Sequence, residues 1–172
     1  PNADATPGMV GMFGSIQAGI NLPVSPEVFF TIGGTYTPTG DASFDAKGLT
    51  GNAATAEKTT LVISDLMEVF IEPSFMVSSN AAVFAHAGYT EGEMSVAGDR
   101  VVNTTIDLEG TVISAGIKLL TDGGIFIKGE AGMTNYDTIN IKNITDTAAG
   151  TTASAKGDPT LAFGAITIGY KF

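Results

Sequence analysis

Apolar side chains alternate with small or polar ones through the last residues of this 172-residue chain. Successive side chains of a β-strand point to opposite faces, so alternation of this kind predicts a strand with one apolar face. The opposite face would carry Thr167, Gly169 and Lys171. The apolar face would consist of Ile166, Ile168, Tyr170 and Phe172. The chain therefore ends on a predicted strand whose last side chain is aromatic.

The same kind of pattern recurs along the chain and predicts seven strands, separated by clusters of Gly, Pro, Asn and Asp that favour turns. The predicted strands are Met9–Asn21, Val28–Thr37, Thr60–Ser78, Ala82–Val96, Val101–Leu119, Ile125–Ile141 and Leu161–Phe172. Residues 40–58 and 142–159 form two long polar connections, whereas most of the others are short. Alternating short and long connections are typical of barrels with brief turns at one end and larger loops at the other.

Alternation also assigns the two faces of each strand. The first face is rich in aliphatic residues and includes Ile16, Ala18, Ile20, Leu22, Val69, Ile71, Pro73, Phe75, Val83, Ala85, Ala87, Tyr89, Ile113, Ala115, Ile117, Leu119, Ile125, Ile127, Gly129, Ala131 and Met133. The second face is small, polar or charged and includes Ser15, Gln17, Gly19, Asn21, Glu68, Phe70, Glu72, Ser74, Phe84, His86, Gly88, Thr90, Ser114, Gly116, Lys118, Lys128, Glu130, Gly132 and Thr134. Periodicity alone does not say which face is outermost.

Composition narrows the class of protein. The chain is 44% hydrophobic, yet no apolar run approaches the roughly twenty residues that a transmembrane helix needs, whereas a tilted membrane strand needs about ten. Its length suits a single domain, residues 1–172. The chain has no Cys, so disulfide and thiol chemistry are excluded. A net charge of −10 argues against nucleic acid as a partner, because nucleic-acid binding requires a basic face.

The alternating carboxy-terminal strand resembles the assembly signal of bacterial outer-membrane β-barrels. Further motifs lie at residues 14–19, 71–75, 83–89 and 126–130. With these motifs, the chain from about residue 9 onward resembles the small OmpA-like and opacity-type surface proteins. The resemblance implies an all-β, antiparallel, up-and-down transmembrane barrel of eight strands in the outer membrane of a Gram-negative bacterium. It also implies contact with outer-membrane lipid, lipopolysaccharide and the barrel-assembly machinery, which would read Ile166, Ile168, Tyr170 and Phe172.

Strand direction leads to a further expectation. If the last strand runs from the outside to the periplasm, counting back through seven strands makes the first one run inward as well. Bacterial barrels normally have an even number of strands, since an open edge leaves backbone groups unpaired in lipid. We therefore expect the first strand and the export signal to be missing upstream of Pro1. The alternative is a strand donated in trans by another molecule.

The charged residues of the second face predict a network inside the barrel. An eight-stranded barrel has room inside only for side chains, so buried charges there must satisfy one another. The expected members are Glu68, Glu72, His86, Lys118, Lys128 and Glu130. We expect no cofactor and no metal site, because the spacing of the acidic residues matches no calcium loop.

Three functions remain open. The first is a structural and surface-interaction barrel whose long loops, residues 40–58 and 142–159, bind an extracellular ligand or a neighbouring protein. The alternative is a narrow, porin-like channel for ions or small solutes. An enzyme centred on His86, the single histidine, is disfavoured because no Ser nucleophile with suitable spacing is identifiable. A soluble ligand-binding barrel would place the apolar face inside, and the terminal Phe172 favours lipid outside instead.

Overall fold

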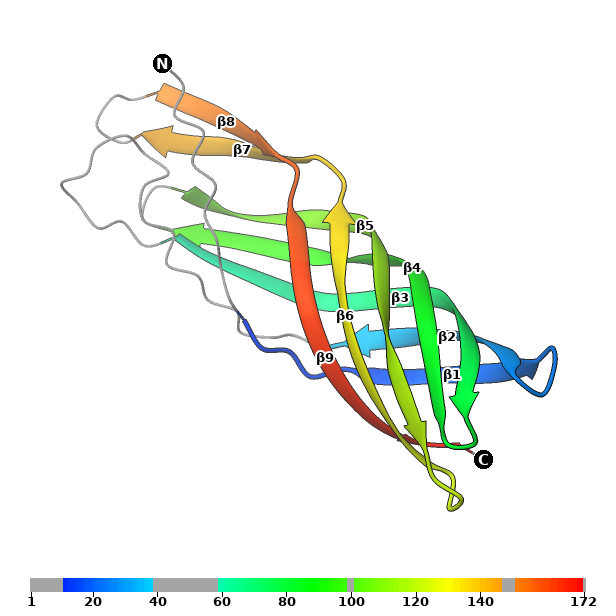
Figure 1. Cartoon of the computed structure of the whole chain (residues 1–172). Helices are drawn as coiled ribbons and strands as arrows, with labels where there is room; N and C mark the ends of the chain where they lie inside the picture. Colours follow the sequence, from blue (N-terminus) through cyan, green and yellow to red (C-terminus); the bar gives the residue numbers. More distant parts are fainter. Residues whose placement is uncertain (1–10, 39–58, 99–100, 147–150, 172) are drawn as a thin grey trace.

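The computed structural model describes residues 11–38, 59–98, 101–146 and 151–171, and these form an all-β, antiparallel structure without helices (Figure 1). Among them, no helix has the length and apolar character needed to cross a membrane. Residues 40–58, predicted as a loop, lie outside the described residues, as do Phe172 and the connection between β4 and β5. The predicted fold class is thus confirmed at the level of an antiparallel all-β sheet.

The main sheet has seven strands, hydrogen-bonded in the order β1-β2-β3-β4-β5-β6-β9. Their bounds are β1 Ile16–Pro23, β2 Val28–Thr37, β3 Thr59–Ser78, β4 Ala81–Gly98, β5 Val101–Leu120, β6 Ile125–Tyr136 and β9 Thr160–Tyr170. The bounds of β2 are those predicted from the sequence, and those of β3, β4 and β5 differ from the prediction by one or two residues. Turn residues therefore marked these boundaries well, because Pro, Gly, Asn and Asp interrupt an otherwise regular alternation.

Two boundaries were predicted wrongly. The first strand was expected from Met9, which lies outside the described residues, but residues 11–15 are described and are not part of a strand. Pairing of β1 with β2 stops at Ile16 and Tyr36, near the end of β2, and among the described residues no strand pairs with the chain before Ile16. The strand expected over Ile125–Ile141 ends instead at Tyr136.

The long loop predicted at residues 142–159 is largely a hairpin. Strands β7, Ile139–Asp146, and β8, Thr151–Gly157, pair antiparallel with each other, and β7 touches β5 at Val101 and Ile144. The composition of this segment, rich in Thr, Ala and Gly, suggested a loop because it lacks an apolar face. Thr is β-branched, however, and favours strands without needing a buried partner.

The seven-stranded sheet is curled about one of its faces. Figure 1 shows its strands tilted and bent, with the C-terminus near the short turns and β7 and β8 at the opposite end. Side chains of strands that are not neighbours meet on the inner face: Lys128 of β6 contacts Gln17 of β1, and Lys118 of β5 contacts Glu72 of β3. Contacts of this kind require strong curvature, because a flat sheet would hold these strands far apart.

The two faces of the sheet have inverted polarity. Buried residues of the inner face include Glu72 and Lys128, each only 1% exposed, whereas Val69 is 66% and Ile166 82% exposed on the outer face. The burial of the sheet therefore follows the two faces that alternation assigned. Gly19 and Asn21 of the inner face are exposed, because β1 lies at the edge of the sheet.

Strands β1 and β9 stand at the two ends of the strand order, and among the described residues they do not pair with each other. Within the described ranges, β1 and β9 are therefore the two edge strands of the curled sheet. Beyond the inner charged residues, a small apolar cluster lies further along β4 and β5. It is formed by Met94, Leu108 and Tyr136, with Ile63, Leu66, Ile106, Ile139 and Leu161 packed against it.

Close packing on the inner face of β5 gives a direct test of this fold. A Cβ at Gly116 would meet the ring of Phe84 at 2.8 Å and would overlap the carbonyl oxygen of Gly129, whereas a Cβ at Gly129 would meet nothing within 4 Å. We expect Gly116→Ala to lower the free energy of unfolding by about 1–3 kcal/mol and Gly129→Ala to change it little. Urea unfolding followed by circular dichroism measures both, and equal effects would contradict the packing.

Candidate functional site

The six charged residues predicted for the inner face lie on four adjacent strands and come together there. Glu68 and Glu72 belong to β3, His86 to β4 and Lys118 to β5. Lys128 and Glu130 belong to β6. Each occupies an inward position of its strand, so the alternation that buries Phe70 and Phe84 also directs these charges into the same space.

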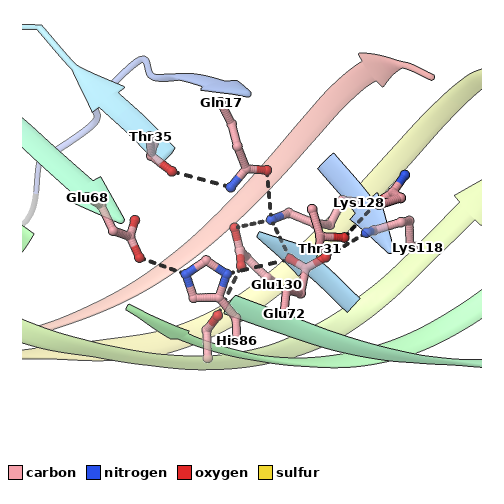
Figure 2. Close-up of polar contacts among 11 residues, drawn as sticks. Gln17, Thr31, Thr35, Glu68, Glu72, His86, Lys118, Lys128 and Glu130 are labelled. Carbon is pink, nitrogen blue, oxygen red and sulfur yellow. Dashed lines mark hydrogen bonds and ion pairs between the residues drawn. The ribbon is translucent and has the colours of Figure 1, made fainter. Parts of the chain in front are cut away.

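Glu72 is the centre of the network (Figure 2). Lys118 Nζ donates to Glu72 Oε1 at 2.6 Å, and Lys128 Nζ donates to Glu72 Oε2 at 3.2 Å. His86 Nδ1 lies 3.5 Å from the same Oε2. Residues 46 and 56 positions apart in the sequence thereby share one buried carboxylate, which joins β3 to β5 and β6 across the inner space.

His86 lies between two carboxylates. Its Nε2 atom is 2.7 Å from Glu68 Oε1, and its ring stacks on Phe70 with centroids 4.6 Å apart. Gly88 leaves the room that Glu68 occupies, because a Cβ at this position would overlap the Glu68 carboxylate. Both ring nitrogens thus face acidic groups, so His86 lies between the two carboxylates of β3 and links them to β4.

Glu130 completes the network on the side of β6. Lys128 Nζ lies 3.3 Å from Glu130 Oε1, and Ser114 Oγ donates to Glu130 Oε2 at 3.0 Å. Lys128 therefore contacts two carboxylates while almost wholly buried. Such a cation is stable inside a protein only when its charge is paired and its donors are used.

Two features of the site were missed in the sequence. Gln17 of β1 accepts a hydrogen bond from Lys128 at 3.2 Å and donates one to Thr35 at 3.3 Å. Its inward position was recognised, but an uncharged side chain gave no reason to include it. The second feature is aromatic: Lys118 Nζ lies 5.4–5.8 Å from three ring centroids, and the rings are those of Phe29, Phe84 and Phe126. Cation–π attraction adds to the pairing of this lysine.

The arrangement is suited to filling and bracing an interior. It brings together three carboxylates, two lysines and one histidine, and nearly every charge has an opposite charge within 3.5 Å. Within the described ranges, no group of three or more His, Cys, Asp or Glu has the geometry to hold a metal ion. These side chains neutralise one another's charges, and their ion pairs fix the relative positions of the strands.

The residues predicted as the C-terminal assembly signal lie apart from this network. Ile166, Ile168 and Tyr170 point to the outer face of β9 and are exposed, while Phe172 lies outside the described residues. Strand β9 pairs in continuous register with β6, from Ile125 opposite Tyr170 to Asn135 opposite Thr160. The apolar side chains of this strand therefore continue the outer apolar face.

No protein-family model matches the chain, and no curated protein or solved structure is significantly similar to it. The function must therefore be argued from the residues and their arrangement.

Removing the central carboxylate tests the network. Glu72→Gln would leave two buried lysines without their shared partner, and we expect the free energy of unfolding to fall by on the order of 3 kcal/mol. Glu27→Gln is the matched control, because Glu27 is exposed in the turn before β2. Urea unfolding of the two variants beside the unaltered protein measures the difference. A Glu72→Gln protein as stable as the control would show that the network does not brace the sheet.

Proposed function

We propose that this protein is an outer-membrane β-barrel that is anchored by its apolar exterior and presents its loops at the bacterial cell surface. The observation that carries the proposal is the inverted polarity of the sheet. Its outer face exposes large apolar side chains (Ile, Val, Leu, Phe or Tyr) on every strand of the main sheet, while charged side chains are buried on the inner face. An apolar surface that extends across all seven strands is a liability in water and the normal exterior of a protein in lipid.

Closure of the sheet into a barrel is part of the proposal. The strands of the main sheet alternate in direction, and because there are seven of them, the two edge strands β1 and β9 run the same way. One additional strand running the opposite way would pair antiparallel with both edges. An eight-stranded barrel would then leave no edge in the hydrocarbon, where unpaired backbone groups cost several kcal/mol each.

The contents of the inner face favour a structural and surface role over a narrow channel. Glu72, Lys118 and Lys128 are buried and paired across the interior, with phenylalanine rings beside them. An eight-stranded barrel has room only for such side chains. In this proposal the hairpin of β7 and β8 and residues 40–58 face the outside, where they present a binding surface beside lipopolysaccharide, while the C-terminal strand contacts the assembly machinery.

A charge placed on the outer face tests whether lipid surrounds it. Ala115 is exposed near the middle of the outer face, where its register partners are Ala85 and Ala131. Ala115→Arg would be harmless in water, but at the midplane of a bilayer it should lower the free energy of unfolding from lipid vesicles by about 2–4 kcal/mol. Val24→Arg, in the exposed turn after β1, is the control and should have little effect. Equal stability of the two variants would contradict the proposal.

Closure has its own test, in which the natively purified protein in detergent is weighed intact and run on a gel with and without heating. A closed barrel migrates as a compact form until it is heated. We expect a compact unheated form, and the intact mass gives the length of the chain that forms it. A single extended form under both conditions would contradict closure.

A further inference from the structure

Two tyrosines on the outer face are each tied to an acidic residue of a neighbouring strand. Tyr36 of β2 donates a hydrogen bond from its hydroxyl to Asp65 Oδ1 at 2.8 Å, and Tyr89 of β4 donates one to Glu109 Oε2 at 2.7 Å. Both rings are exposed, so each tyrosine presents an apolar ring outward while its hydroxyl is held by a carboxylate. Tyrosines with one apolar and one polar end are enriched where hydrocarbon meets water.

The outer face changes character at these tyrosines. On β4, the outward positions up to Tyr89 are uncharged, and the next two are Glu91 and Glu93. The same change occurs on β5, where Glu109 and Asp107 lie opposite those two glutamates in the pairing register. Like charges placed opposite each other repel, and neither they nor Asp65 could lie in hydrocarbon. The acidic part of the outer face must therefore lie beyond the apolar core of a bilayer.

The distance from the short turns to this change matches the thickness of a membrane. Strand β4 begins at Ala81, directly after its turn, and reaches Tyr89 after about nine residues, the length of a tilted strand that crosses the hydrocarbon core. Beyond Tyr89 the strand continues to Gly98, and β3 and β5 extend with it. The part of these strands beyond the tyrosines is thus in excess of what a membrane can cover.

From these observations we propose that Tyr36 and Tyr89 lie at the headgroup boundary of the outer leaflet, with the five carboxylates beyond them in water. The carboxylates are Asp65, Glu91, Glu93, Asp107 and Glu109. The inference rests on the proposed membrane function and adds the depth at which the protein sits. The hydrogen bonds to Asp65 and Glu109 point each hydroxyl toward the water side, so the rings act as depth markers fixed to the sheet.

The absence of Trp from the sequence permits a direct measurement of depth. The full natural protein, with any Trp outside residues 1–172 replaced by Phe, is prepared with single substitutions Tyr89→Trp, Tyr36→Trp or Ala115→Trp and reconstituted in phosphatidylcholine vesicles. The lipids carry bromine either close to the headgroup or close to the end of the acyl chain, and quenching of the single Trp is measured with each. Ala115→Trp serves as the deep reference, because this position lies on the outer face between the tyrosines and the short turns.

We expect Trp at positions 89 and 36 to be quenched several-fold more by the shallow bromines than by the deep ones, and Trp at position 115 to show the reverse. Having two tyrosine positions keeps the test valid if one variant fails to fold. The placement would be overturned if Trp at positions 89 and 36 were quenched mainly by the deep bromines. It would also be overturned if Trp at these two positions were not quenched while Trp at position 115 was. Either result would leave the proposed membrane function standing. Absence of quenching at all three positions would overturn both.

Discussion

The carboxylate of Glu72, shared by Lys118 and Lys128, is the interaction on which the rest of the structure depends. Hydrogen bonds in the sheet connect only neighbouring strands, whereas these contacts connect β3 to β5 and to β6 across the interior. They stabilise the curl of the sheet, and the curl separates a polar inside from an apolar outside. Because a buried charge without its partner costs far more than the pair contributes, the sheet is confined to a curvature that keeps all three groups together.

From that curvature follows the proposed environment of the protein. A soluble sheet buries its apolar face and exposes its polar one, whereas this sheet does the opposite on the strands with charged inner positions. An arrangement with the apolar face outside and the polar face inside is favourable only if the surroundings are less polar than the interior. This is the situation of a small barrel in a bilayer. In this proposal, the tyrosines and carboxylates of the outer face lie where the hydrocarbon of the bilayer ends. The inner network, the outer apolar face and the proposed depth are therefore consistent with one another.

Much of this could be predicted from the sequence because β-structure has a period of two. Alternation placed Glu72, His86 and Lys118 on one face, and turn residues located the ends of β2 correctly. Pairing across the interior is not written in any local pattern: Gln17 meets Lys128 only because the sheet curls, over a separation of 111 residues. The hairpin of β7 and β8 was missed because its sequence, rich in Thr and Ala, was interpreted as a polar loop. The bonds of Tyr36 and Tyr89 depend on cross-strand register, which the sequence alone does not specify.

Extraction of the natural protein from the membranes of the cells that make it tests the central claim most directly. Envelope membranes are washed at high salt and then at alkaline pH, which removes proteins held only at the surface, and the protein is followed by immunoblot. The account predicts that it stays in the membrane pellet through both washes and is released only by detergent, because its exterior is apolar. Recovery in the soluble fraction, or release by the alkaline wash, would contradict an exterior that faces lipid.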